Sequence, residues 1–98
     1  MGSDKKSEEI MTAAVSLAVE RGYMKFSRAQ VASRAQVSEG LVSYYYSEMA
    51  NLRTEVVRYA IRHNVLPIVA AALVTAHPLA LEAPLEVRKL AAESLLTP

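Results

Sequence analysis

The side chains best suited to contact a ligand lie in a short run, SEGLVSYYY, at residues 38–46. Two serines and three consecutive tyrosines bring five hydroxyl groups, each able to donate or accept a hydrogen bond. A helix turns by about 100° per residue, so the tyrosines cannot all face a core. We expect Tyr44 to be exposed and Tyr46 to lie mainly in the core. Hydroxyls on an exposed helix face suit hydrogen bonds to phosphates or base edges.

Residues that catalysis or metal binding requires are scarce. The chain has no cysteine, and its two histidines, His63 and His77, lie fourteen residues apart. We find no glycine-rich phosphate loop and no paired carboxylates at a useful spacing. The sequence therefore predicts no enzyme, no catalytic residue, no metal site and no cofactor.

Two short helices are predicted to position the polar run. Ser27 and Ser38 each precede a helical pattern, and serine is a favoured N-cap because its hydroxyl accepts from a free backbone N–H. Gln36 and Val37 interrupt the pattern between the two segments. Two short helices joined by a tight turn form a helix-turn-helix, whose second helix can enter the major groove of DNA.

Residues 31–52, VASRAQVSEGLVSYYYSEMANL, resemble the DNA-binding domain of the TetR family of bacterial transcriptional regulators. The family pattern is roughly V/I-A-x-x-A-G-V-S-x-G-x-(L/V)-x-x-(H/Y)-F-x-x-K-x-x-L. Gln36, Tyr46 and Met49 stand where that pattern has glycine, phenylalanine and lysine. The resemblance covers about residues 7 to 64. The matching residues are Val31, Ala32, Ala35, Val37, Ser38, Gly40, Val42, Tyr45 and Leu52.

The candidate DNA contacts lie on the helix-turn-helix and just after it. Gly40 lets the helix backbone approach DNA closely, and Leu41 could contact a thymine methyl. Arg28 and the helix N-terminus beside it could hold a phosphate; a solvated surface charge is the alternative. The second helix has no Arg, Lys, Asn or Gln, so we expect readout by apolar contacts, DNA shape and half-site spacing. The predicted DNA-binding set is Ser27, Arg28, Gln36, Ser38, Glu39, Gly40, Leu41, Ser43, Tyr44, Tyr45 and Asn51.

Helices on both sides should complete the DNA-binding domain, which we assign to residues 1–64. A tail over residues 1–6 precedes a helix over 7–21, which opens at a serine cap and ends at Gly22. Tyr23 and Phe26 are expected to fill the core. A longer helix over about 47–64 follows, and Arg53 near its start could reach the DNA backbone. Asn64 and Pro67 mark the boundary.

Residues 65–98 are predicted to form a short helical dimerisation segment. The stretch LPIVAAALVTA at 66–76 is apolar nearly all round and must be buried on most sides. Because a 98-residue chain has little length to cover it, we expect a second copy to do so, together with an amphipathic helix over 84–96 after a short link. The predicted interface residues are Leu66, Ile68, Val69, Leu73, Leu85, Leu90 and Leu95.

Composition is consistent with an all-α fold: a TetR-like three-helix helix-turn-helix domain plus the dimerisation segment. Hydrophobic residues make up 52% of the chain, and its net charge is +1. The charge over residues 1–64 is +2, which supports phosphate binding only weakly. We see no signal peptide or membrane span and expect a cytoplasmic protein without a small-molecule inducer site.

Two functions fit these features. The first is a repressor that binds double-stranded DNA as a homodimer on an inverted-repeat operator. The second is a protein-interaction module that reuses the helix-turn-helix fold, such as an antirepressor or an assembly protein. The uncharged second helix and the missing lysine at Met49 favour this alternative.

Overall fold

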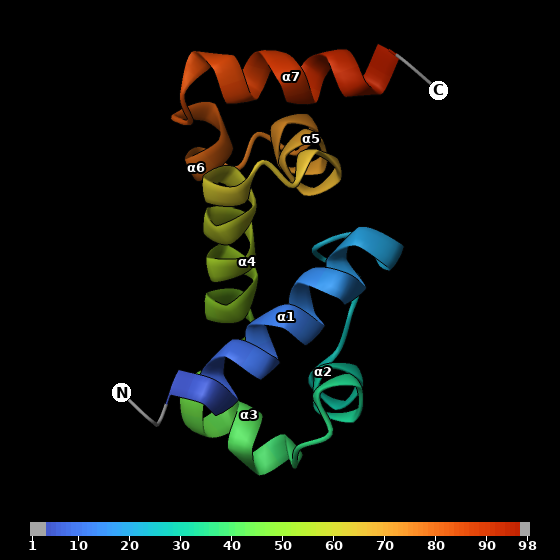
Figure 1. The fold of residues 1–98 in the computed structure, drawn as a ribbon, viewed down its shortest axis with the longest axis vertical. Helices are drawn as coiled ribbons and strands as arrows, with labels where there is room; N and C mark the ends of the chain where they lie inside the picture. The colour runs from blue at the N-terminus through green and yellow to red at the C-terminus, as the bar shows by residue number, and fades with distance from the viewer. Residues whose placement is uncertain (1–3, 97–98) are drawn as a thin grey trace. The chain divides into compact units, whose positions relative to one another are not determined.

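Every regular element in the computed structural model, which describes residues 4–96, is an α-helix (Figure 1). This confirms the predicted all-α class. The chain divides into two compact units between Val56 and Val57, inside the fourth helix. The helices are α1 (Asp4–Arg21), α2 (Arg28–Ala35), α3 (Glu39–Tyr45), α4 (Met49–His63), α5 (Leu66–Val74), α6 (Pro78–Leu81) and α7 (Leu85–Leu96).

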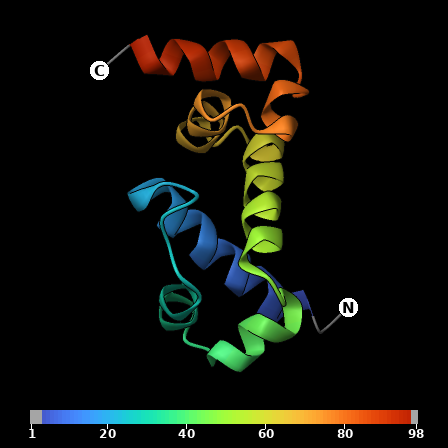
Figure 2. The same cartoon turned by 180° about the vertical axis from the view of Figure 1, so that it is seen from behind.

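In the first unit, α1 packs against α2, and α2 packs against α3 (Figures 1 and 2). Ile10, Ala14 and Leu17 of α1 recur every three or four residues and are buried. This spacing places them on one face of the helix. Tyr23 and Phe26, in the α1–α2 loop, are also buried, as predicted. The helix-turn-helix therefore rests on a continuous apolar core.

Two boundaries in this unit differ from the prediction. Helix α1 begins at Asp4 rather than at Ser7. The prediction of a tail is therefore wrong for residues 4–6. Residues 1–3 lie outside the described part of the chain. Lys6 Nζ lies 3.5 Å from Glu9 Oε1 one turn further on, a pairing that favours helix before Ser7. Helix α4 begins at Met49, two residues later than expected.

In the second unit, α5 packs against α7 and α6 (Figure 1). Ile68, Val69, Ala70 and Ala72 of α5 are all buried, as is Ala91 of α7. The expectation that one chain could not cover α5 is therefore wrong for these residues. Small alanine side chains on both helices allow the two helix axes to approach closely. Because of this close approach, α7 can cover these α5 residues without a second copy.

The segment after α5 was expected to be a plain link, but it contains α6. Ala76 has a φ of 57°, and the His77 N–H donates to Ala72 O at 2.8 Å, which ends α5. His77 Nδ1 then accepts from the Leu79 N–H at 3.1 Å and caps the next turn. Proline at the first helical position, Pro78, supports this turn.

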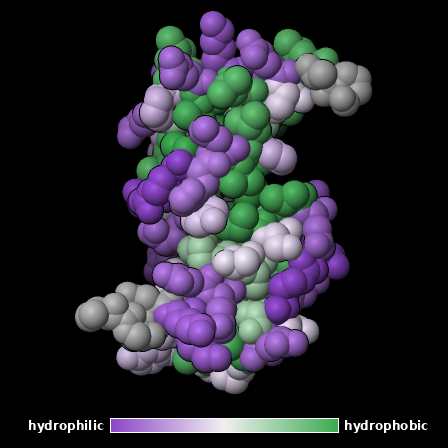
Figure 3. Space-filling view, in the orientation of Figure 1, coloured by the Kyte–Doolittle hydropathy of each residue, from purple (hydrophilic) through white to green (hydrophobic). Residues whose placement is uncertain are grey.

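Several large apolar side chains of the second unit remain exposed. Hydrophobic residues reach the surface over α5–α7 in the upper part of Figure 3. No helix within residues 4–96 is long and apolar enough to span a bilayer. The large exposed apolar residues of this unit are Val74, Leu81, Leu85, Leu90, Leu95 and Leu96.

Candidate nucleic-acid interface

The first helix of the helix-turn-helix begins with a reciprocal cap. Ser27 Oγ accepts from the Gln30 N–H at 3.2 Å, and Gln30 Oε1 accepts from the Ser27 N–H at 2.9 Å. This capping box satisfies two backbone donors at the helix start. Ser27 is therefore the N-cap that the sequence predicts. Its role in DNA binding stays a prediction.

The turn between α2 and α3 depends on one residue with a left-handed backbone. Gln36 has φ 61° and ψ 44°, and its N–H donates to Ser33 O at 3.2 Å. The Val37 N–H donates to Ala32 O at 3.0 Å. Glycine is the usual residue in this conformation because other residues are strained there. The backbone thus explains why the TetR pattern has glycine at this position.

We expect Gln36→Gly to stabilise the protein by about 0.5–1 kcal/mol, because glycine removes the strain of the left-handed conformation. Urea unfolding measures this difference. Gln36→Ala is the control, since it removes the amide but retains the strain. If both variants lose the same DNA affinity, the Gln36 amide contacts DNA. Equal stability of Gln36→Gly and the wild type would contradict the strain argument.

Helix α3 presents a mixed polar and apolar face to solvent. Ser38 Oγ accepts from the Leu41 N–H at 3.0 Å and caps the helix, as predicted. Tyr44 is 79% exposed, which confirms the expectation for this side chain. Tyr46 is only half-buried, although burial is still sufficient to raise the pKa of its phenol. Tyr44 is thus the aromatic side chain of α3 that is most available to a ligand.

The remaining predicted contacts on α3 differ in exposure. Glu39 and Gly40 are exposed, whereas Leu41 and Tyr45 are half-buried. The Tyr45 ring packs edge-on against Tyr44, with ring centroids 5.1 Å apart. Ser43, another member of the predicted DNA-binding set, is also half-buried. The outward face of α3 is therefore centred on Glu39, Gly40 and Tyr44.

Gly40 is not required by the packing of the domain. A Cβ added there would meet only Ser38 Oγ, at 3.7 Å, which is an ordinary contact. Its backbone is not in the left-handed region either. Glycine weakens a helix relative to alanine. Within residues 4–96, neither crowding nor strain explains it, which supports close approach by an external partner.

Two arginines that were candidates for phosphate contacts are engaged within the domain. Arg28 Nη1 donates to Ser43 Oγ at 3.1 Å and to Tyr46 O at 2.8 Å, while Nη2 donates to Ser47 O at 3.2 Å. Arg53 Nη2 donates to Phe26 O at 2.8 Å, and its guanidinium carbon lies 5.6 Å from the centre of the Phe26 ring. Neither side chain is a solvated surface charge.

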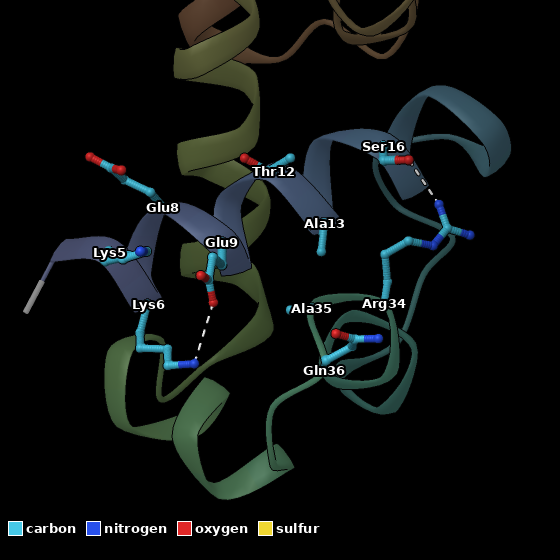
Figure 4. A pocket seen from close by; sticks show the side chains of 10 residues that line it. All are labelled: Lys5, Lys6, Glu8, Glu9, Thr12, Ala13, Ser16, Arg34, Ala35 and Gln36. Carbon is cyan, nitrogen blue, oxygen red and sulfur yellow. Dashed lines mark hydrogen bonds and ion pairs between the residues drawn. The ribbon is translucent and has the colours of Figure 1, made fainter.

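A groove of about 700 Å³ lies between α1 and the end of α2 (Figure 4). Lys5 and Lys6 on its lining are balanced by Glu8 and Glu9. Arg34 makes two bonds to the Glu20 carboxylate, at 2.8 and 3.0 Å, and these bonds lower the pKa of that carboxyl. The groove thus offers no clear excess of positive charge to an anion.

Asn51 is exposed in the first turn of α4. Among the predicted interface residues, Ile68 and Val69 are buried in the single chain, Leu66 and Leu73 are half-buried, and the remaining three are exposed. Among residues 4–96, no cluster of His, Asp or Glu could hold a metal ion.

The capped α2, the left-handed turn and the exposed α3 define a helix-turn-helix domain. Residues 10–56 match the family model of the bacterial regulatory proteins of the tetR family. Residues 10–56 therefore form an N-terminal helix-turn-helix domain of the tetR family type. No curated protein and no solved structure matches the chain.

Proposed function

We propose that this protein is a transcriptional repressor that binds an inverted-repeat operator as a homodimer. In this proposal, residues 1–64 bind DNA and residues 65–98 hold two copies together. The protein acts on double-stranded DNA in the cytoplasm and needs no cofactor or small-molecule inducer. Repression follows if the bound dimer occupies the site that RNA polymerase requires.

The exposed face of α3 is the observation that carries the proposal. It combines an exposed tyrosine with a glycine that the domain itself does not need. Tyr44 can donate to a phosphate, and the bare backbone at Gly40 allows close approach to the groove. Because α3 has no basic residue, one copy should bind weakly. Two linked copies on adjacent half-sites would bind far more tightly, because the second contact becomes intramolecular.

The exposed leucines of α7 support a revised dimer surface. Leu85, Ala92 and Leu96 fall within about 40° of one another around the helix, whereas Leu90 lies about 140° from Leu85. Leu90 is flanked by two acids, Glu86 and Glu93, whereas the stripe is bordered by Lys89, whose apolar stem can lie along it while the ammonium stays in solvent. We assign the pairing surface to the stripe of Leu85, Ala92 and Leu96, and Leu90 leaves the proposed interface.

Selection from random duplex DNA at two salt concentrations tests the proposed function. We expect enrichment of an inverted repeat whose binding weakens as salt rises, because released counterions drive phosphate contacts. A promoter that carries the selected site should then be transcribed less when the protein is present. Activation of that promoter would contradict repression without contradicting DNA binding.

The same selection distinguishes the alternative function. If no sequence is enriched and binding is weak even at low salt, the helix-turn-helix serves a protein partner instead. Enrichment of a single half-site, without a repeat, would contradict the dimer and leave sequence-specific binding intact.

A further inference from the structure

We propose that Arg28 is a positioning residue that sets the orientation of α3 and the hydrogen-bonding direction of Ser43, rather than a phosphate contact. This inference rests on the proposed DNA-binding function and assigns a role within it. The sequence alone favours neither a phosphate contact nor a solvated charge for Arg28. Its three hydrogen bonds within the domain support a third role.

The Arg28 guanidinium binds where two helices of the domain meet. Arg28 is the first residue of α2, while Tyr46 and Ser47 follow the last residue of α3. The carbonyls of Tyr46 and Ser47 lie where the backbone leaves the helix, and both accept from Arg28, at 2.8 and 3.2 Å. One rigid fork therefore ties the start of α2 to the end of α3. The positive charge also suits the negative end of the α3 dipole.

The same guanidinium also bonds the Ser43 side chain. Its Oγ accepts from Arg28 Nη1 at 3.1 Å. A guanidinium has donors but no acceptor, so the Ser43 hydroxyl hydrogen cannot return to Arg28 and is available to donate elsewhere. Ser43 therefore meets DNA as a donor, to a phosphate oxygen or to a base acceptor in the major groove, which guanine, adenine and thymine each present. The role of Ser43 as a donor thus depends on the hydrogen bond that Arg28 gives to its oxygen.

Binding to the selected operator, measured across a salt series, separates positioning from phosphate contact. The variants are Arg28→Lys and Arg28→Gln, with Arg34→Gln as the matched control. Arg34 is on the same helix, carries the same charge and bonds Glu20 instead of α3. Titration at high DNA concentration gives the active fraction of each variant, which removes the effect of incomplete folding.

Under the positioning role, both Arg28 variants lose about tenfold in operator affinity, the effect of one charged hydrogen bond. Affinity for unrelated DNA and the slope of log affinity against log salt stay at the wild-type values. Lysine does not rescue binding, because one ammonium group cannot reproduce the fork. Ser43→Ala should add little to Arg28→Lys, since the two residues act together.

Under a phosphate role the results reverse. Arg28→Gln would flatten the salt slope by about 0.9 per chain and weaken binding to all sequences, and Arg28→Lys would restore it. That pattern would overturn the proposal. If the wild type itself binds no DNA, the proposed function fails before this test begins, so the two failures are distinguishable. If Arg28→Gln does not fold, Arg28→Lys alone decides, because it retains the charge.

Discussion

Gly40→Ala is expected to make the protein more stable and a poorer DNA binder. Alanine stabilises a helix interior by up to about 1 kcal/mol relative to glycine, and we expect a smaller gain at Gly40 because it lies in the first turn of α3. The added Cβ meets only Ser38 Oγ within the domain, so the fold does not resist it. If α3 lies against DNA with Gly40 at the contact, the same Cβ holds the helix away from the groove. We expect operator affinity to fall about tenfold for each half-site.

Thermal unfolding and operator titration of the same Gly40→Ala sample measure the two effects. Ser33→Ala is the control, because Ser33 is an exposed residue of α2 and alanine also improves its helix propensity. It should raise stability without changing operator affinity. Wild-type DNA affinity in Gly40→Ala would contradict the placement of α3 against DNA at this residue. Lower stability would show that Gly40 serves the fold.

The backbone of the helix-turn-helix could be predicted from local sequence signals. Ser27 and Ser38 are N-caps in the structure, and Gly22 and Asn64 take the positive φ values expected of residues that end helices. Each of these signals acts within a few residues, through one side chain or one backbone angle. For this reason a single sequence is sufficient to reveal them.

The partners of long polar side chains could not be predicted in the same way. Arg28 and Ser43 are fifteen residues apart, and Arg53 and Phe26 are twenty-seven apart. A flexible side chain reaches different partners according to how the helices cross, and periodicity carries no information about that crossing. The covering of α5 by α7 was missed for a related reason, since it depends on close approach at alanines such as Ala91.

Leu85→Glu is expected to convert the homodimer to monomers and to weaken operator binding by about a hundredfold or more. If two α7 helices pair antiparallel about a two-fold axis, Leu85 lies beside Leu96 of the other copy. A charge there would lose its hydration on pairing, a cost that an ion pair with Lys89, one turn further on, does not repay, so association is opposed. The monomer should still fold, because Leu85 is 67% exposed and an acid suits the first turn of α7. A monomer contacts only one half-site, so it loses the gain in operator affinity that two linked contacts provide.

Leu90→Glu is the matched control for this prediction. It makes the same change on the same helix, but on the side that carries Glu86 and Glu93. Sedimentation should give a dimer for Leu90→Glu and a monomer for Leu85→Glu, and both variants should bind an isolated half-site alike. If Leu90→Glu alone becomes monomeric, the pairing surface lies on the opposite side of α7. If both remain dimers, the second copy pairs through another part of the chain, and the exposed Val74 of α5 becomes the next position to substitute.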